Sequence, residues 1–238
     1  MRLSICICTY NRARSLAQTL DSLIPAVAGL TDIEIVIVDN NSTARTPQTI
    51  AHYARTLPIV SVFEGLQGLS IARNTAVTSS CGELVLFTDD DTRWDDGSIH
   101  ALLDEARDHP QVAFVGGRIL PQWPNGAPRW LHDPTLDLIA GVLGHYDLGA
   151  EARPVEASSG LPYGANFAVR RDALNKLGQF DESLGAVGTR RRRGEDSDLI
   201  QRAISHGYQG RYVPGALCMH AIDPRNLRLA KLFEVGFE

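Results

Sequence analysis

The first half of the chain alternates short hydrophobic runs with segments in which apolar residues recur at helical spacing. Residues 33–38 are almost entirely β-branched, which is typical of a strand covered on both faces. Leu16, Leu20 and Leu23 recur at the spacing of one helix face. Strand alternating with helix in this way predicts an α/β fold with a doubly wound, mostly parallel sheet. The expected strands are 3–8, 33–38, 59–63, 84–88 and 112–115, and the expected helices are about 46–55, 69–79 and 98–107.

Residues 118–160 break this rhythm. The stretch is rich in proline and carries Trp123 and Trp130 in polar, glycine-rich surroundings. A loop of this length in a compact domain is usually functional or disordered, and the tryptophans argue against disorder. We therefore expect a long irregular excursion. Regular structure should return with a strand at 165–170, helices at about 172–177 and 197–206, and a strand near 211–213.

Composition narrows the class of protein. With 238 residues, 44% of them hydrophobic and 21% charged, the chain resembles an ordinary soluble globular protein. A net charge of -5 argues against nucleic acid as a partner. No apolar run approaches the roughly 20 residues of a membrane span, and the N-terminus leads directly into a strand pattern. We expect a cytoplasmic location and leave a peripheral membrane contact open. The cysteines lack the paired spacing of a zinc or redox motif.

Three adjacent acids, Asp89, Asp90 and Asp91, close the hydrophobic strand expected at 84–88. Their carboxylates repel one another and need a counter-charge, for which a hard divalent cation such as Mg²⁺ or Mn²⁺ is suited. Ligands of open α/β sheets bind beyond the carboxyl ends of the strands, where this triplet would lie. The alternative is a solvated acidic turn that leads into the next helix.

Polar clusters also occur at 9–12, at 39–42 and at 73–74. One such cluster is only a turn, but several at consecutive strand ends indicate a single site. The glycine fingerprint of dinucleotide-binding folds and the phosphate-binding loop of nucleotide triphosphatases are both missing, which excludes those classes. An aspartyl phosphatase would use the Asp-x-Asp spacing of the triplet, but it carries that motif after the first strand rather than the fourth.

The order of these motifs resembles that of the family 2 glycosyltransferases. The resemblance implies the GT-A fold, a Rossmann-like doubly wound sheet with an irregular excursion on the acceptor side, and it covers most of residues 3–220. Two departures stand out. The middle position of the triplet is often non-acidic in the family, and we expect that a C-terminal extension common in the family is absent or was removed after His220. The segments that carry the resemblance are 7–12, 36–42, 68–74, 87–91, 164–167 and 194–199.

The resemblance implies that residues 1–117 bind a nucleotide-sugar donor, with UDP as the nucleotide. Asp39 would accept the N3 proton of uracil, and Arg73 would donate to a carbonyl of the base. The structural alternative for Arg73 is an ion pair on a helix surface. Asp89 or Asp90 would hold the ribose. The full set implied to bind the nucleotide is Thr9, Tyr10, Asn11, Arg12, Asp39, Arg73, Asp89 and Asp90.

The resemblance also implies a Mn²⁺ or Mg²⁺ ion that bridges the two phosphates. Asp91 would bind this ion, with Asp89 as a second ligand. His220 matches a position from which the family often supplies a further ligand, although a lone histidine equally fits a structural role. The expected metal site is therefore Asp91, Asp89 and His220.

Residues 118–238 are expected to bind the acceptor and to carry the catalytic acids. Asp196 resembles the family's base, which takes the proton of the acceptor hydroxyl in an inverting single displacement. Glu195 would position the acceptor or its neighbour. Because both acids open a helix, a capping or helix-dipole role is the alternative. The expected acceptor contacts are Gly164, Ala165, Asn166, Trp123 and Trp130.

Arg190 to Arg193 form the most unusual charge run in the chain. Glycines flank the run, so it fits a mobile lid that orders on a diphosphate or an anionic acceptor. A solvated loop fits the same pattern equally well.

The sequence thus predicts a metal-dependent, inverting glycosyltransferase of the hexosyltransferase class. Its acceptor would be a saccharide, a lipid-linked sugar or a small metabolite, as in polysaccharide biosynthesis. A sugar-phosphate nucleotidyltransferase would need a glycine-rich basic loop after the first strand, and residues 9–14 do not provide one. A catalytically silent module that binds sugar nucleotides would have no need of the triplet or of Glu195 and Asp196.

Overall fold

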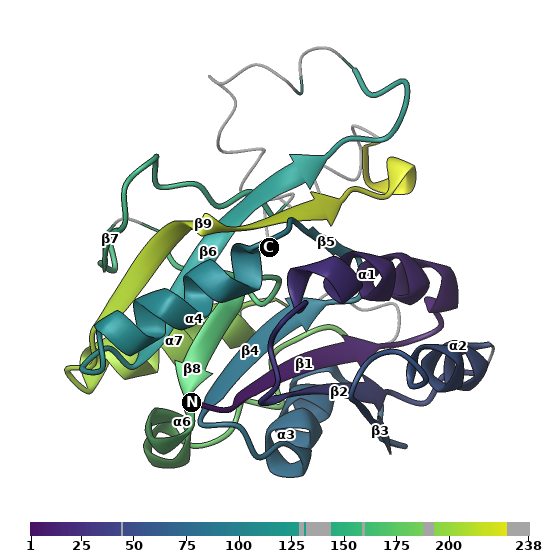
Figure 1. Cartoon of the computed structure of the whole chain (residues 1–238), viewed down its shortest axis with the longest axis horizontal. Helices are drawn as coiled ribbons and strands as arrows, with labels where there is room; N and C mark the ends of the chain where they lie inside the picture. Colours follow the sequence, from purple (N-terminus) through teal and green to yellow (C-terminus); the bar gives the residue numbers. More distant parts are fainter. Residues whose placement is uncertain (44, 129–130, 132–143, 159, 188–192, 228–238) are drawn as a thin grey trace.

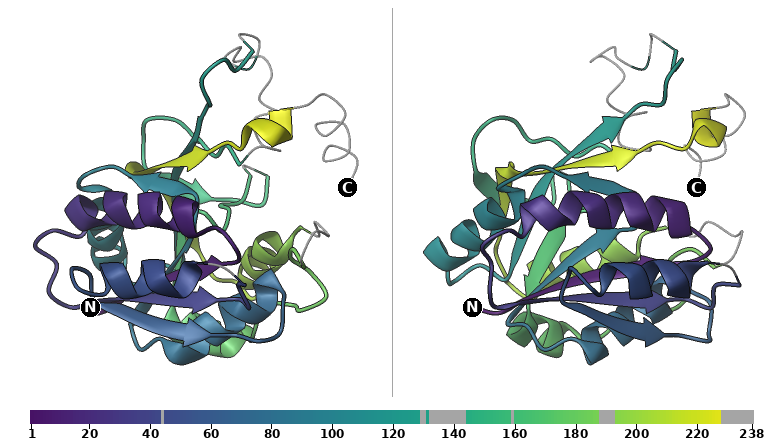
Figure 2. Two further views of the ribbon diagram at one scale, coloured as in Figure 1. Left: turned by 90° about the vertical axis from the view of Figure 1, so that its right-hand side faces the viewer. Right: turned by 45° about the vertical axis from the view of Figure 1, so that its right-hand side comes forward.

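The computed structural model describes residues 1–43, 45–128, 131, 144–158, 160–187 and 193–227. One mixed sheet runs through the molecule, with helices on both of its sides (Figures 1 and 2). Trp130 and residues 188–192, which include most of the expected lid, lie outside the described residues. In chain order the elements are β1 (Leu3–Thr9), α1 (Ala13–Ala26), β2 (Ile33–Asp39), α2 (Thr46–Tyr53), β3 (Ile59–Phe63), α3 (Leu69–Ser79), β4 (Leu84–Asp89), β5 (Thr92–Trp94), α4 (Ser98–Asp108), β6 (Phe114–Gln122), β7 (Arg153–Val155), β8 (Phe167–Arg170), α6 (Arg171–Leu177), α7 (Glu195–Ser205), β9 (Gly210–Ala221) and the 3₁₀ helix η3 (Pro224–Leu227).

The N-terminal half of the sheet is parallel, in the order β3-β2-β1-β4. Apart from a few residues at their ends, β1, β2 and β4 are buried, as their hydrophobic sequences predict. In the register of these strands Thr9 pairs with Asp39, and Cys8 pairs with Asp89. The expected doubly wound sheet is confirmed here, and three of the predicted polar clusters share one edge of it.

The C-terminal half of the sheet is mixed. β8 lies antiparallel between β4 and β6, while β6 and β9 are parallel. The expected strand at 112–115 was predicted too short, because β6 continues through Gly116 and Gly117 to Gln122. A side chain on Gly117 would overlap the carbonyl oxygen of Ala216 and the side chain of Asn166. Glycine therefore serves close packing inside this strand and does not end it.

β9 is also longer than expected, because it continues past Val213 to Ala221. The register with β6 shifts after Gly117, so that Val213 and Leu217 face consecutive residues of β6. Residues 214–216 form the resulting bulge and begin with a proline, which suits an unpaired position. Beyond the bulge, His220 pairs with Thr92 of β5. The three-residue strands β5 and β7 were not predicted.

The helices fall into two groups. α1 contacts α2 and α4, whereas α3 packs against β1, β2 and β3, and α6 contacts α7. α7 begins at Glu195, two residues before the helix expected at 197, after Gly194 with a φ of 104°. Glu195 and Asp196, the acid pair, therefore lie in the first turn of α7. In the part of the chain that the structure describes, no helix is both long and apolar enough to cross a membrane.

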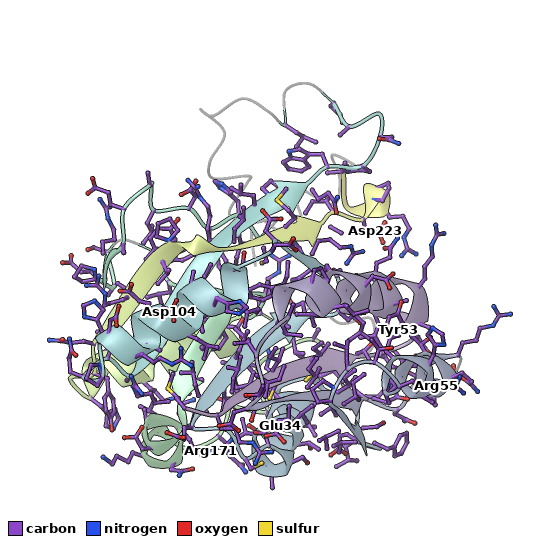
Figure 3. The ribbon with its side chains drawn as sticks, viewed as in Figure 1. Glu34, Tyr53, Arg55, Asp104, Arg171 and Asp223 are labelled. Atoms are coloured by element: carbon purple, nitrogen blue, oxygen red, sulfur yellow. The ribbon has the colours of Figure 1, made fainter. Side chains whose placement is uncertain are left out.

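Buried polar contacts fasten the opposite edge of the sheet, near the start of β2 and β4. Glu34 accepts hydrogen bonds from the Ser4 hydroxyl at 2.6 Å and from the Cys81 amide at 2.6 Å. The guanidinium of Arg171 donates to the Gly82 carbonyl at 2.6 Å and to the Ser80 hydroxyl at 2.7 Å. Figure 3 labels Glu34 and Arg171 in this region.

Residues 180–186, which precede the acid pair in the chain, are attached to α3. Asn74 accepts a hydrogen bond from the Phe180 amide at 2.8 Å and donates to the Phe180 carbonyl at 3.1 Å. The Ser70 hydroxyl donates to the carbonyl of Leu184 at 2.8 Å. The Leu69 amide donates to the carbonyl of Ala186 at 2.9 Å. α3 thus fixes the path of the chain that leads toward α7.

We predict that Asn74→Ala lowers the free energy of unfolding by roughly 1–3 kcal/mol, because two backbone groups of Phe180 lose their partner. Thr78→Ala on the same helix is the control, since the Thr78 hydroxyl donates only to the Asn74 carbonyl one turn away. Both changes gain alanine's helix propensity, so that gain largely cancels. Urea unfolding measures the difference. An equal shift for the two variants would contradict the anchoring role of Asn74.

Candidate functional site

The three acids of the triplet have different surroundings. Asp90 is buried and accepts a hydrogen bond from the Thr9 hydroxyl at 2.7 Å, and Nη1 of Arg12 lies 3.0 Å from it. Nη2 of Arg12 donates to Asp91 at 2.6 Å. Asp89 ends β4 and has a side chain that is 37% exposed. Arg12 therefore supplies the counter-charge for Asp90 and Asp91. Asp89 lies instead near Arg73.

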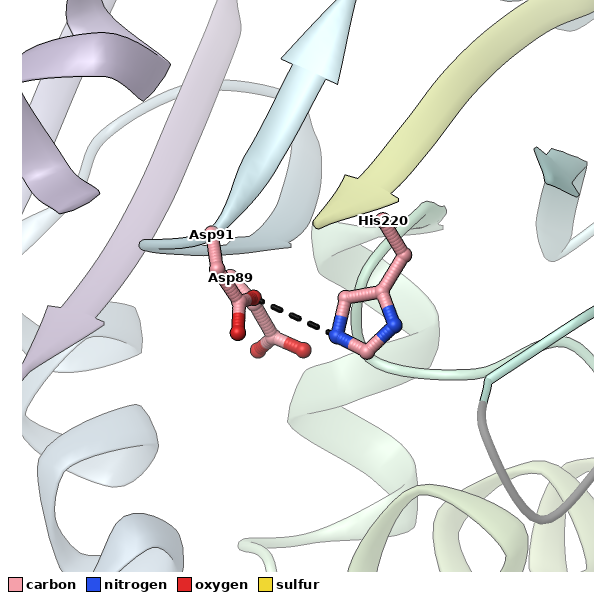
Figure 4. Close-up of side chains that lie close together, drawn as sticks. All are labelled: Asp89, Asp91 and His220. Atoms are coloured by element: carbon pink, nitrogen blue, oxygen red, sulfur yellow. Dashed lines mark ion pairs between the residues drawn. The ribbon is translucent and has the colours of Figure 1, made fainter. Parts of the chain in front are cut away.

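Asp89, Asp91 and His220 form a cluster (Figure 4) whose ligand atoms all lie within 4.8 Å of one another. Nε2 of His220 lies 3.4 Å from Oδ1 of Asp91. Among the described residues this buried oxygen accepts no hydrogen bond. Gly144, with a φ of 82°, leaves room for the histidine ring, because a Cβ there would lie 2.9 Å from Nδ1. Two carboxylates, one of them with a buried oxygen that accepts no hydrogen bond, and an imidazole fit a divalent cation such as Mn²⁺ or Mg²⁺.

Burial and neighbouring charges shift the pKa values of Asp90 and Asp91 in opposite directions. Burial raises the pKa of Asp90 to about 7, although Arg12 opposes the shift. Burial also disfavours the charged form of Asp91, but His220 and Arg12 outweigh it and hold the pKa of Asp91 below its usual range. Asp91 is therefore the acid of the triplet that stays ionised most readily, as a metal ligand must.

The acid pair at the start of α7 meets the triplet through Arg73 of α3. The side chain of Arg73 is buried, and its Nη1 donates to Glu195 at 2.7 Å and to Asp196. Its Nη2 lies 3.6 Å from Asp89. One guanidinium thus contacts three carboxylates from two separate parts of the chain, the end of β4 and the start of α7.

Asp196 is held on both of its oxygens. Oδ1 accepts from Arg73, and Oδ2 accepts from the backbone amide of Gly164 at 2.8 Å. Burial raises the pKa of Asp196 to about 7, with Arg73 opposing and Glu195 reinforcing the shift. The N-cap of α7 is Gly194, so these contacts with other segments distinguish Asp196 from a simple capping residue.

The loops after β1 and β2 are hydrogen-bonded to each other. Asp39 is buried and accepts from the Ser42 amide at 3.0 Å. The backbone amide of Asn11 donates to the Ser42 hydroxyl at 2.8 Å, and the side-chain oxygen of Asn11 accepts from the Thr43 backbone amide at 2.8 Å. Tyr10 is half-buried in the same loop. The structure therefore brings the expected nucleotide-binding residues of both loops together.

Asn40 contributes to this region, although the sequence argument gave it no role. Its side-chain oxygen accepts from the Gly68 amide at 2.9 Å, and its nitrogen donates to the Leu66 carbonyl at 2.6 Å. These bonds attach the loop before α3 to the end of β2. The available signal was its place in the polar run at 39–42.

The expected acceptor residues divide between several places. Gly164 contacts the acid pair, as described above. Asn166 is fully buried and donates to the carbonyls of Ala216 at 2.7 Å and Arg118 at 3.1 Å, while Ala165 is buried beside it. Asn166 thus links strands within the sheet. 

Of the two tryptophans in the excursion, the structure describes Trp123. Trp123 packs against Leu131 and Ile222 in a small apolar cluster that is separate from the main core. Trp130 lies outside the described residues.

Comparisons with known proteins identify the fold and the family of the chain. Succinoglycan biosynthesis protein ExoM of Rhizobium meliloti is 30% identical, over 100% of this chain and 72% of that protein. Mannosyltransferase PcManGT from Pyrobaculum calidifontis, solved with GDP-Man and Mn²⁺, superposes with a TM-score of 0.70 at 23% identity, over 95% of this chain and 58% of that one. S. aureus TarS 1–349 with UDP-GlcNAc gives a TM-score of 0.67 at 18% identity, over 94% and 59%.

The chain therefore spans about three fifths of the length of those two solved structures, which share its fold and confirm the expected GT-A architecture. Residues 4–178 match the family model described as glycosyl transferase family 2. That match begins in β1 and ends after α6, and so includes the edge of the sheet that carries the triplet. The chain belongs to glycosyl transferase family 2.

Proposed function

We propose that this protein transfers a sugar from a nucleotide-sugar donor to an acceptor hydroxyl with inversion at the anomeric carbon. Arg73 provides the observation that carries the proposal. It contacts Asp89 in the triplet and Asp196 in the acid pair, so a cation site and a candidate base flank one guanidinium. Such an arrangement suits a reaction in which a diphosphate leaves on one side while a hydroxyl loses its proton on the other.

Residues 1–117 would form the donor half of the site, with UDP as the nucleotide. The buried Asp39 and the joined loops after β1 and β2 support a nucleoside pocket there. The named complexes of the two solved relatives contain GDP-Man and UDP-GlcNAc, which supports a nucleotide sugar as the donor class. Asp89, Asp91 and His220 would hold a Mn²⁺ or Mg²⁺ ion. When bound, the cation neutralises charge on the leaving diphosphate.

Residues 118–238 would form the acceptor half and supply the base. The acceptor hydroxyl gives its proton to Asp196 as its oxygen bonds to the anomeric carbon. The bond from that carbon to the diphosphate breaks, and its electron pair leaves with the nucleotide. A pKa of about 7 suits Asp196 to this role, because a base works best when its pKa lies near the working pH.

The acceptor would be a growing saccharide or a lipid-linked sugar, and the pathway would be the synthesis of a polysaccharide. The naming of ExoM as a succinoglycan biosynthesis protein supports that proposal. The function is tested by incubating the protein with UDP-sugars and Mn²⁺ and measuring the release of UDP. A silent binding module would bind UDP and release none from the sugar nucleotide, whereas a nucleotidyltransferase would release pyrophosphate from UTP and a sugar phosphate.

We predict that UDP binds measurably only with Mn²⁺ or Mg²⁺ and displaces GDP and ADP. Asp91→Asn removes a cation ligand and should weaken this binding by at least roughly tenfold, since even outer partners of a metal site are worth 10–100-fold. Asp104→Asn is the control, because Asp104 is an exposed residue of α4 (Figure 3). Titration calorimetry checks the result. Equal affinity for the three diphosphates would contradict UDP selection, and binding without metal would contradict the role of the triplet.

The second prediction concerns catalysis. Asp196→Asn should leave the affinity for UDP and Mn²⁺ nearly unchanged and lower turnover by roughly 10²–10⁴-fold, the usual contribution of a positioned base. Asparagine keeps the shape of the side chain and can still accept from the Gly164 amide. Steady-state release of UDP measures the loss. Turnover equal to the wild type would return Asp196 to a structural role.

The third prediction is the pH dependence of the wild-type rate. Asp196 must be ionised to accept a proton, and burial places its pKa at about 7. Turnover should therefore fall as the pH drops below about 7 and level off above it. The residual rate of Asp196→Asn should lack this acidic limb. A wild-type rate that is flat down to pH 5 would contradict the assignment.

A further inference from the structure

Arg73 has surroundings that differ from those of a nucleoside-binding arginine. The residue is 3% exposed, and among the described residues its ion-pair partners are Glu195, Asp196 and Asp89. An arginine that reads a base must present donor atoms to an open pocket. Here Nη1 donates to the acid pair and Nη2 faces Asp89, so the donors are directed at carboxylates.

The guanidinium is also confined by groups that carry no charge. The Phe180 ring lies 5.5 Å from its central carbon, within the range of a cation–π contact. Phe180 is in turn fixed to α3 through Asn74. On Gly164, an added Cβ would lie 2.7 Å from the Arg73 central carbon and 2.8 Å from Oδ1 of Asp196. The site therefore requires glycine at this position and leaves the guanidinium little freedom to turn.

These contacts set the direction of the Asp196 carboxylate. One oxygen accepts from Arg73 and the other from the Gly164 amide at 2.8 Å. Each carboxylate oxygen has two acceptor directions, so the contacts of the described residues leave one direction on each oxygen for an incoming hydroxyl. A planar fork can hold the acid pair and Asp89 together, whereas the ammonium of lysine acts as a single point charge.

We propose that Arg73 is a positioning residue of the transfer reaction, which orients Asp196 for the acceptor hydroxyl and ties it to Asp89 at the cation site. The proposal rests on the proposed function, in which Asp196 is the base. It differs from the role that family resemblance implies for Arg73, which is contact with the nucleobase.

The charges around Asp196 give the proposal a pH signature. Arg73 faces it from α3 and Asp89 from β4, while Glu195 neighbours it in α7 and the Gly164 amide bonds to it. Arg73 is the cation in this set and opposes the rise in the pKa of Asp196. Loosening that contact should raise this pKa further and move the acidic limb of the rate to higher pH.

The test compares Arg73→Lys with Arg171→Lys. Arg171 donates to backbone and hydroxyl oxygens at the other edge of the sheet and has no role in the site, so it controls for the loss of a guanidinium. Arg73→Lys should keep the Kd for UDP and Mn²⁺ within about threefold. It should lower kcat roughly 10–100-fold, as expected for a misplaced catalytic group, and shift the acidic limb upward. Arg171→Lys should preserve kcat and the limb.

A loss of UDP binding without a loss of kcat would overturn the proposal. If Arg73→Lys weakens UDP binding more than tenfold and leaves kcat and the acidic limb unchanged, Arg73 is a nucleobase ligand and the proposal is wrong. If Arg73→Lys does not fold, Gly164→Ala carries the test, because its methyl group would displace the same guanidinium. Gly164→Ala should then show the same loss of kcat and the same shift, and a wild-type profile would overturn the proposal.

A stability cycle separates this proposal from the proposed function. Absence of turnover in the wild type would end the assignment as a transferase, but the contact can still be measured. Arg73→Lys and Asp196→Asn should change the midpoint of urea unfolding non-additively, because each removes the other's partner. Arg171→Lys and Asp196→Asn should be additive. Additivity in both cycles would overturn the positioning role whatever the activity.

Discussion

A buried positive charge organises the site. An ion taken out of water costs several kcal/mol even after the protein relaxes, and carboxylates gathered in one place repel one another. Arg73 removes both difficulties at once, because Asp89, Glu195 and Asp196 surround its guanidinium. The two halves of the chain therefore meet through this ionic contact as well as through the sheet. The charge that stabilises the acids also fixes their directions.

A second arginine explains the unusual middle acid of the triplet. Asp90 is buried, bonded to Thr9 and paired with Arg12, which also contacts Asp91. The additional carboxylate therefore comes with its own counter-charge, and burial favours its neutral form. Asp89 and Asp91 remain directed toward His220. In this way the chain carries three consecutive acids without gathering three negative charges around one cation.

Much of this arrangement could be predicted from the sequence. Buried strands end at the same edge of a parallel sheet, so the clusters after β1, β2 and β4 had to converge. The C-terminal half was less predictable, because β9 continues well past the strand expected near 211–213 and β5 has only three residues. The partners of Arg73 could not be read from local pattern, since Glu195 lies on a different helix far along the chain. Packing of α3 against the sheet decides that contact.

The bulge in β9 determines which side chains reach the triplet. Neighbouring residues of a strand point to opposite faces, and His220 faces Asp91 only because the register with β6 shifts before it. Removing one residue from 214–216 would present Ala221 in place of the imidazole while leaving every acid in position. The length of this bulge thus determines whether His220 reaches Asp89 and Asp91. Insertions or deletions at residues 214–216 would change the residue that faces Asp91, whereas substitutions there would leave the register unchanged.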